Sequence, residues 1–564
     1  MAKKILIVGG VAGGASAAAR LRRLDEAAKI IMFERGAYIS FANCGLPYHI
    51  GGTIENRDDL LLQTPESFRK RFNVEVRTRN EVVKIDRSNK RVEVLDLNSG
   101  EKYVEEYDKL VLSPGAEPTR PPISGIDSDR IFTLRNVPDT DRINDFIDSH
   151  QPKRAVVVGG GYIGLEMAEN LRDRGMLVAI VEMLDQVMPL MDREMANILH
   201  GQLHRHNIAL WLDDAVTNFE QSEDWLSVGL KSGMQLSCDF AVLAIGVRPE
   251  TKLAKDASLE IGPRGGIRVS PSLQTNDPDI YAVGDAVEVR DFVLGEPTLI
   301  PLAGPANKQG RMVADNICGG NRSYTGTQGT AILKVFDLTA AMTGASEKTL
   351  AKTNLKYEKL YLHPANHVGY YPGAQQMHVK VLFTKPEGKI LGAQIVGSDG
   401  VDRRIDIFAV AIRAGLTVFD LQELELAYAP PYGSGKDAVN MAGFAAVNIL
   451  DGTVEIVHWD DLGEDDFILD VRTPGEFGKG NVPSSVNIPV DELRNRLDEL
   501  PHDTVINAYC GVGIRSYIAC RTLMQSGFVA RNISGGFITY CSYENKELSE
   551  TKTARQLREE FCLT

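Results

Sequence analysis

The seven cysteines of this 564-residue chain include no C-x-x-C pair; they are odd in number and far apart. This pattern excludes a zinc ribbon and argues against a secreted disulfide framework. The chain also has no basic run that would neutralise nucleic-acid phosphates. Its 62 basic and 76 acidic side chains give a formal net charge of −14. We therefore expect no nucleic-acid partner.

Long apolar stretches are absent as well, since none approaches the roughly 18 residues that a membrane helix needs. Near the start, small apolar residues follow two lysines, as in a signal peptide, but the glycine-rich run Gly9–Gly14 fits a nucleotide-binding turn better. His200, His204 and His206 lack further ligands at fitting spacing, so we interpret them as a solvated helix face. We expect a cytoplasmic protein without membrane contact or bound metal.

The length allows three to five domains at roughly 100–200 residues each. The first pattern along the chain is an apolar strand, Ile5–Val8, followed by Gly9–Gly14 and an Ala-rich helix. A second strand, Ile30–Phe33, ends at Glu34, where a carboxylate accepts hydrogen bonds from a ribose. The middle position of the G-x-G-x-x-G pattern is Val11, so this turn alone is a weak signal.

A second turn fits the same pattern fully. The strand Ala155–Val158 leads into Gly159–Gly164 and a helix, and the next strand, Val178–Val181, ends at Glu182. An acid at that position favours a free 2′-hydroxyl over a 2′-phosphate, so we expect NADH rather than NADPH. Two such units indicate two nucleotide sites in one chain.

Four further blocks resemble those of the two-dinucleotide flavoprotein reductases: residues 111–116, 244–249, 280–286 and 300–307. In that family the first unit binds FAD and the second binds NAD(P)H. The FAD contacts that the resemblance implies are Gly9, Val11, Ala12, Gly14, Glu34, Arg35, Val82, Ser113, Gly115, Asp285, Pro301 and Ala303. The corresponding NAD contacts are Gly159, Gly161, Tyr162, Ile163, Gly164 and Glu182.

One cysteine lies in a distinctive run, Ser40-Phe41-Ala42-Asn43-Cys44-Gly45-Leu46-Pro47-Tyr48. A lone thiol closes no internal disulfide, so its oxidised form is a mixed disulfide, a persulfide or a sulfenic acid. The run resembles the coenzyme A-disulfide reductases and their relatives, which include NADH oxidases and NADH-dependent persulfide reductases. The resemblance implies that Cys44 is the nucleophile, as a thiolate beside the flavin.

The same resemblance implies a coenzyme A site. Its contacts are Ser16, Arg20 and Arg23 on the first helix, Ser40 and Asn43 beside the nucleophile, and Lys436. Either Lys70 or Arg71 matches a further phosphate contact, and of these two we choose Arg71. Arginine side chains suit phosphate because they donate paired hydrogen bonds.

Residues from about 326 to 450 resemble the dimerisation domain of that family. Two segments, His367–Gly373 and Tyr428–Tyr432, match those that place tyrosines beside the partner subunit's cysteine. We assign this role to Tyr370 and Tyr428, with Tyr371 and Tyr432 as packing neighbours; a phenol can donate a proton to a leaving thiolate. The resemblance therefore implies a homodimer with a shared active site.

A second sulfur site is predicted near the C-terminus. A strand ends at Cys510, and the loop Cys510–Arg515 leads into a helix, so its backbone N–H groups form an anion cradle. The region 460–545 resembles a rhodanese domain, with Cys510 as the sulfur carrier and Arg515 closing the C-x₄-R loop. The cradle predicts that anionic donors of the thiosulfate or polysulfide type enter here. Roles for Cys520, Cys541 and Cys562 stay open.

The predicted fold is α/β, with FAD- and NAD-binding domains, an α+β dimerisation domain and a C-terminal rhodanese domain. The predicted limits are 1–115 and 250–325 for the FAD domain and 116–249 for the NAD domain. The dimerisation domain is predicted at 326–450 and the rhodanese domain at 460–545. The expected function is NADH-dependent, flavin-dependent reduction of sulfur–sulfur bonds in persulfides, polysulfides or coenzyme A disulfide. Two alternatives remain: an NADH oxidase that reduces dioxygen, and a non-catalytic sulfane-sulfur carrier or redox sensor.

Overall fold

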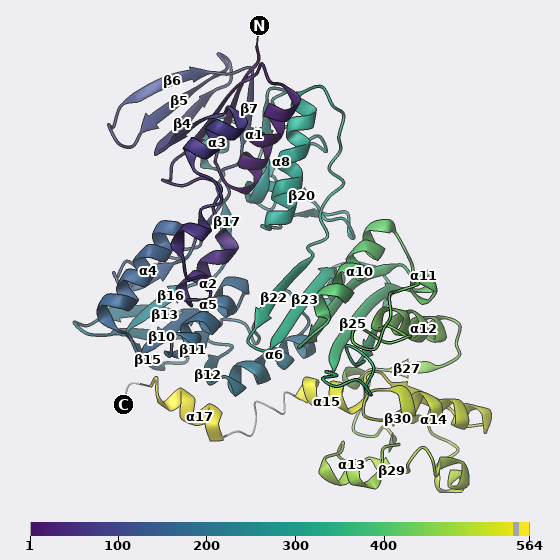
Figure 1. The fold of residues 1–564 in the computed structure, drawn as a ribbon. Helices are drawn as coiled ribbons and strands as arrows, with labels where there is room; N and C mark the ends of the chain where they lie inside the picture. The colour runs from purple at the N-terminus through teal and green to yellow at the C-terminus, as the bar shows by residue number, and fades with distance from the viewer. Residues whose placement is uncertain (1, 545–551, 563–564) are drawn as a thin grey trace. The chain divides into compact units, whose positions relative to one another are not determined.

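A computed structural model describes residues 2–544 and 552–562 of the chain (Figure 1). These residues form two compact units. One unit contains the described parts of 1–183, 214–329 and 561–564, and the other those of 184–213 and 330–560. Among the described helices, none is long and apolar enough to span a membrane.

The first glycine-turn region builds a parallel five-stranded sheet. Its strands lie in the order β19-β7-β1-β2-β3. Their bounds are Ile280–Ala282 for β19, Lys109–Leu112 for β7, Lys4–Val8 for β1, Lys29–Glu34 for β2 and Glu75–Thr78 for β3. Two helices, α1 (Ala12–Leu24) and α8 (Ala303–Ile317), pack side by side (Figure 1). A Cβ on Gly310 of α8 would lie 2.2 Å from the Gly13 carbonyl oxygen, so this close packing requires glycine.

The second glycine-turn region repeats the parallel arrangement. Its strands β11, β10, β16 and β9 are neighbours in that order. Their bounds are Leu177–Val181, Arg154–Val158, Phe240–Leu243 and Ile131–Thr133, and the helices of this region are α4 (Val137–His150) and α5 (Tyr162–Asp173). All four strands of the two predicted glycine-turn motifs are confirmed.

Three smaller antiparallel sheets belong to the same unit. The first has the order β4-β5-β6, the second β13-β14-β15, and β17 pairs with β8. Their bounds are Asn80–Asp86, Arg91–Asp96 and Lys102–Glu106 for the first, Val216–Gln221, Leu226–Leu230 and Gln235–Cys238 for the second, and Val247–Pro249 and Ala116–Pro118 for the pair.

In the other unit, an antiparallel five-stranded sheet has the order β22-β23-β26-β25-β24. Its strands are Ala331–Val335, Leu338–Gly344, Ile390–Gly397, Met377–Thr384 and Tyr357–Leu362. The helices beside it in sequence are α9 (Glu347–Leu350), α10 (Val401–Ala414), α11 (Val418–Glu423) and α12 (Ala438–Leu450).

The C-terminal region of this unit has a parallel sheet of order β27-β31-β30-β28-β29. Its strands are Glu455–Val457, Ala530–Ile533, Ile506–Tyr509, Ile468–Asp470 and Val486–Asn487. The helices are α13 (Pro474–Lys479), α14 (Ile514–Gln525) and α15 (Gly536–Glu544), and a later helix, α17, covers Lys552–Glu559. The predicted α/β fold with an α+β region is therefore confirmed.

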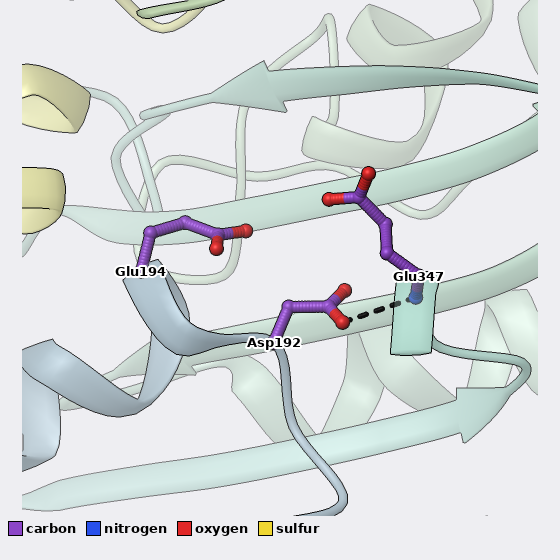
Figure 2. A group of neighbouring side chains, drawn as sticks. All are labelled: Asp192, Glu194 and Glu347. Carbon is purple, nitrogen blue, oxygen red and sulfur yellow. Dashed lines mark hydrogen bonds between the residues drawn. The ribbon is translucent and has the colours of Figure 1, made fainter. Parts of the chain in front are cut away.

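Three acidic side chains, those of Asp192, Glu194 and Glu347, face a common space in this unit (Figure 2). The ammonium group of Lys380 fills it: its Nζ lies 2.8 Å from Asp192 and 2.5 Å from Glu194, and contacts Glu347. The Lys380 side chain is fully buried. Burial acts to lower the pKa of Lys380, but the three carboxylates raise it above its usual value. The cluster is therefore a buried ion network in which lysine takes the place of a metal.

Replacing Lys380 by methionine is expected to destabilise this unit by about 3–5 kcal/mol, because the carboxylates would remain buried without their cation. The loss should shrink as the pH is lowered, since carboxylates that have lost their cation can take up protons. Urea unfolding at pH 5 and pH 8 measures both effects. Lys102→Met, which removes an exposed ion pair with Glu93, is the control and should hardly move the midpoint. An equal, pH-independent loss in both variants would contradict the interpretation.

The prediction of a solvated histidine face is wrong for two of the three histidines. His200 is fully buried and His204 is 8% exposed, whereas His206 pairs with Asp337. All three belong to α6 (Arg193–Arg205) and its C-terminal end, and α6 packs against β12 (Ile208–Trp211), β26 and α15. Burial lowers the pKa of His200 to about 3 and that of His204 to about 4. These histidines are therefore neutral core residues.

Candidate functional site

Both glycine turns have the same internal geometry. Gly9 and Gly159 adopt φ angles of +96° and +106°, which favour glycine. A Cβ on Gly14 would lie 1.9 Å from the Gly9 carbonyl oxygen, and the same distance separates a Cβ on Gly164 from the Gly159 oxygen. The sequence pattern thus reflects two equivalent strand-to-helix turns.

The acids at the strand ends hold these turns. Glu34 accepts hydrogen bonds from the Gly10 N–H at 2.9 Å and the Gly36 N–H at 2.8 Å. Glu182 accepts one from the Gly160 N–H at 2.7 Å. Each predicted ribose ligand therefore also fixes the backbone of its own turn.

The helix N-termini at both turns suit an anionic group. No side chain of the described residues caps α1 or α5, and their first turns, which are fully described, contain no acidic residue. A Cβ on Gly161 would meet nothing within 4 Å, so space is open in front of α5. The unpaired N–H groups and the helix dipole favour a pyrophosphate there. The predicted FAD and NAD turns thus fit dinucleotides.

The other predicted FAD positions come from separate strands and helices of the same unit. Val82 lies on β4, Ser113 and Gly115 follow β7, Asp285 follows β19, and Pro301 and Ala303 flank the start of α8. A further predicted position, Arg35, forms an ion pair with Glu250. Within the described chain, no hydrogen-bond donor reaches the half-buried Asp285 carboxylate, whose pKa is raised by burial. That carboxylate therefore keeps its acceptor capacity for a ribityl chain.

Cys44 is exposed on the short 3₁₀ turn Asn43–Gly45. The next helix, α2 (Leu46–Ile50), packs against α5, which carries Glu166. The pKa of the Cys44 thiol is raised, first by desolvation and then by the negative charges of Glu166 and Asp285. The protein alone thus disfavours the thiolate.

Glu166 is a residue that the sequence analysis missed. Burial raises the pKa of its carboxyl to about 7, while a hydrogen bond from the Tyr48 hydroxyl, at 3.4 Å, acts in the opposite direction. Its position in the sequence could have marked it as a candidate site residue, because Glu166 is two residues beyond the second glycine turn. Its charge therefore changes near neutral pH beside Cys44.

Replacing Glu166 by glutamine is expected to lower the pKa of Cys44, because one nearby negative charge is removed. Alkylation of Cys44 by iodoacetamide at pH 8, in the absence of NADH, should accelerate about threefold to tenfold. Below pH 6, where Glu166 is protonated in the wild type, the two rates should converge. Glu93→Gln on β5 removes an acid that does not act on Cys44 and serves as the control. A rate increase that persists unchanged at pH 5.5 would disprove the electrostatic explanation.

The predicted coenzyme A positions on α1 have partners on α8. The Ser16 hydroxyl donates to Asn307 at 2.5 Å, and Arg20 forms an ion pair with Asp315 at 2.7 Å. Arg23 on α1 and Arg71 on α3 (Pro65–Phe72) are exposed. The two exposed guanidinium groups are therefore the more available phosphate ligands.

The residue beside Arg23 was not recognised from the sequence. Arg22 is 5% exposed and donates hydrogen bonds to five backbone carbonyl groups; two of these, Phe72 and Asn73, lie at the end of α3. Arg22 thus ties α1 to the end of the basic helix that contains Arg71.

Close to the nucleophile, Ser40 has a φ of 45°, an uncommon conformation for a residue other than glycine. Its N–H donates to the Gly10 carbonyl at 2.8 Å. The segment with Ser40 and the exposed Asn43 is thereby fastened to the first glycine turn.

The predicted tyrosines are brought together in the other unit. The hydroxyl groups of Tyr370 and Tyr428 lie 2.9 Å apart, and Tyr370 is 75% exposed. The hydrogen bond between the two hydroxyl groups raises the pKa of Tyr370, which corresponds to the Tyr370 hydroxyl as the donor. Lys436 is also exposed, and its backbone N–H donates to Ser434. These side chains lie on a surface and not in the core.

Cys510 is fully buried at the end of β30. Its Sγ accepts hydrogen bonds from the Gly513 N–H at 3.1 Å and the Ser516 hydroxyl at 3.6 Å. Gly536, at the start of α15, has a φ of +60°, and a Cβ there would lie 2.4 Å from the Cys510 carbonyl oxygen. One backbone N–H and one hydroxyl therefore donate to the sulfur, and the Arg515 side chain interacts with it as well.

The predicted loop arginine is paired. Arg515 donates two hydrogen bonds to Glu476 of α13, at 2.8 and 2.6 Å. The same Glu476 carboxylate accepts hydrogen bonds from Thr473 and completes a capping box. Glu476 thus connects the N-terminus of α13 to the Cys510 loop.

Comparisons with known proteins agree with this arrangement. Residues 3–310 match the model of the pyridine nucleotide-disulphide oxidoreductase family, 330–438 that of its dimerisation domain, and 457–543 that of the rhodanese-like domain. The coenzyme A disulfide reductase of Staphylococcus haemolyticus is 40% identical over 445 residues, which cover 79% of this chain and 99% of that protein.

Two solved structures resemble nearly the whole chain. Reduced CoADR-RHD from Bacillus anthracis is 50% identical, with a TM-score of 0.95 and complete coverage of both chains. An NAD-dependent persulfide reductase from A. fulgidus is 36% identical, with a TM-score of 0.90, and covers 95% of this chain and 100% of its own. The chain therefore belongs to the pyridine nucleotide-disulphide oxidoreductases, within the coenzyme A disulfide reductase family, and carries a C-terminal rhodanese-like domain.

Proposed function

We propose that this enzyme uses NADH to reduce sulfur–sulfur bonds in persulfides, polysulfides or coenzyme A disulfide, with sulfane sulfur delivered by the rhodanese domain. The observation that carries this function is the pair of sulfur sites in one chain. Cys44 is exposed in the unit that contains both glycine turns, and Cys510 lies in an amide cradle. Electron donation and sulfur transfer are thus combined in one protein.

Cys44 is the nucleophile of the reductive half. Its Sγ attacks one sulfur of the substrate, a new S–S bond forms, and the other sulfur leaves with the electron pair of the broken bond. FAD and NADH, when bound, supply the two electrons that regenerate the Cys44 thiol. Because Glu166 and Asp285 raise the pKa of Cys44, protonation of either acid favours the thiolate.

Each glycine turn binds one of the two cofactors. FAD occupies the turn at Gly9 and NADH the turn at Gly159, with Glu34 and Glu182 as ribose ligands. The buried Glu182 would repel a 2′-phosphate, which supports NADH over NADPH.

Coenzyme A is held by the positions predicted on α1, α3 and the Cys44 segment, and Lys436 stays a predicted phosphate contact. We further propose a homodimer, in which the exposed pair Tyr370 and Tyr428 reaches the partner subunit's cysteine and protonates the leaving thiolate. The domain limits from the sequence analysis and a cytoplasmic location, where thiols stay reduced, belong to the same proposal.

A second candidate is dioxygen reduction. A water-forming NADH oxidase from Lactobacillus brevis is 28% identical, with a TM-score of 0.77, and covers 80% of this chain and 100% of its own. That oxidase leaves the rhodanese-like region without a counterpart, which favours the sulfur function. A carrier or sensor without catalysis would not need the intact second turn.

Steady-state NADH oxidation distinguishes these candidates. The full chain is assayed with coenzyme A persulfide, polysulfide, coenzyme A disulfide and dioxygen in parallel. We expect at least one sulfur substrate to support turnover at 100 times the dioxygen rate or more, roughly the smallest rate effect of one well-positioned acid or base side chain. Turnover with dioxygen alone would overturn the sulfur function.

A further inference from the structure

The loop around Cys510 contains only one ionisable side chain besides the thiol, that of Arg515. Both of its hydrogen bonds to Glu476 are shorter than 2.9 Å. The hydrogen bond from Arg515 is the main cause that lowers the pKa of Glu476 to about 2. The carboxylate is thus ionised throughout the physiological range, and it offsets the positive charge of Arg515.

The arginine at the neighbouring strand end is paired as well. Arg472, on the neighbouring strand end, forms a buried ion pair with Asp470 at 2.6 Å and approaches the Tyr509 hydroxyl. Inside the loop, Ile514 is 54% exposed and Val512 is half-buried. The surroundings of the loop therefore combine a backbone N–H donor, aliphatic side chains and two arginines that each form an ion pair.

The charges around Cys510 affect which sulfur donors the site can accept. Thiosulfate brings two negative charges to the thiolate of Cys510, whereas a persulfide, R–S–SH, brings one or none. N–H dipoles can hold either group, but bringing like charges together is unfavourable unless a nearby cation compensates them. In this loop the one cation, Arg515, interacts with Cys510, but the Glu476 carboxylate that it pairs with offsets its charge and so reduces the compensation available to a dianion.

We propose that the Cys510 site accepts sulfur from singly charged or neutral persulfides and discriminates against thiosulfate, and that Glu476 sets this specificity by neutralising Arg515. The inference rests on the proposed sulfur-delivery function and narrows its substrate class. It also differs from the sequence-based expectation that thiosulfate-type donors enter at this loop, which considered the backbone cradle without the Glu476 carboxylate.

The transfer step is the same for both donors and involves no net redox change. The Cys510 thiolate attacks the outer sulfur of the donor, and a bond forms between Sγ and that sulfur. The S–S bond of the donor breaks, and the thiolate R–S⁻, or sulfite from thiosulfate, leaves with the electron pair. The donors thus differ in charge and not in mechanism.

Glu476→Gln tests the proposal, because glutamine keeps an acceptor for Thr473 but removes the negative charge that offsets Arg515. Sulfur transfer from thiosulfate and from N-acetylcysteamine persulfide to cyanide is measured on the full chain without NADH. We expect the wild type to prefer the persulfide in kcat/KM. In the variant, kcat/KM for thiosulfate should rise at least about tenfold, mainly through KM, and this gain should shrink at 0.5 M salt. The kcat/KM of the same variant for the persulfide should change by less than about threefold.

Two variants serve as controls. Glu476→Asp keeps the negative charge and should retain the preference for persulfide. Glu464→Gln removes an acid from an exposed loop of the same domain and should leave both donors at wild-type values. The proposal is overturned if the wild type uses thiosulfate as efficiently as the persulfide, or if Glu476→Gln matches Glu464→Gln. Failure of the proposed function would be visible separately, as sulfur transfer that survives Cys510→Ser or as NADH oxidation without any sulfur substrate.

Discussion

Replacing Cys44 by serine should lower NADH-dependent turnover of persulfide and coenzyme A disulfide by at least about 1000-fold. A hydroxyl is a far weaker nucleophile than a thiolate, and Glu166, with a pKa of about 7, supplies only a weak base nearby. FAD binding should be retained, because its predicted ligands are the turn at Gly9 and residues after β7 and β19. The flavin absorbance should still be bleached by NADH under anaerobic conditions.

Cys318→Ser is the matched control for this experiment. Cys318 is a half-buried cysteine that directly follows α8 in the same unit, and no role in catalysis is expected for it. Its variant should keep wild-type turnover. Near-normal persulfide reduction by Cys44→Ser would exclude the mechanism proposed for this site.

The parts of the fold that were predictable from the sequence depend on short stretches of chain. Each glycine turn, its preceding strand and its acid occupy about 30 consecutive residues, and hydrophobic runs mark the strands. The Cys510 loop is equally local, since strand, loop and helix follow one another. Local patterns of this kind define both the elements and the candidate residues.

What could not be predicted depends on residues that are distant in sequence. The Lys380 cluster combines side chains from α6, α9 and β25, and no spacing rule relates them. Glu166 lies 122 residues from Cys44 and acts on it because α2 packs against α5. His200 was misjudged for the same reason: the polar face of α6 is covered by other elements of its unit.

Replacing Cys510 by serine should abolish sulfur transfer to cyanide, by at least about 1000-fold, because the amide cradle holds a hydroxyl that does not attack a sulfane sulfur. Reduction of long organic polysulfides that end in one S–SH group should also fall, since these singly charged donors are expected to load the Cys510 loop first. Small persulfides and coenzyme A disulfide should keep at least half of the wild-type rate, because they can reach the exposed Cys44 directly. Sulfur transfer to cyanide and NADH oxidation with each sulfur substrate are assayed in parallel on the same variant.

Cys541→Ser, at a half-buried cysteine of α15, is the control and should leave both activities intact. The outcome for small persulfides decides how the two sulfur sites are connected. If Cys510→Ser loses their reduction as completely as Cys44→Ser does, every sulfur atom must pass through the rhodanese domain. The idea that small persulfides reach Cys44 independently would then be wrong. Retained reduction together with lost transfer would instead mean that Cys510 widens the range of donors without being required for reduction at Cys44.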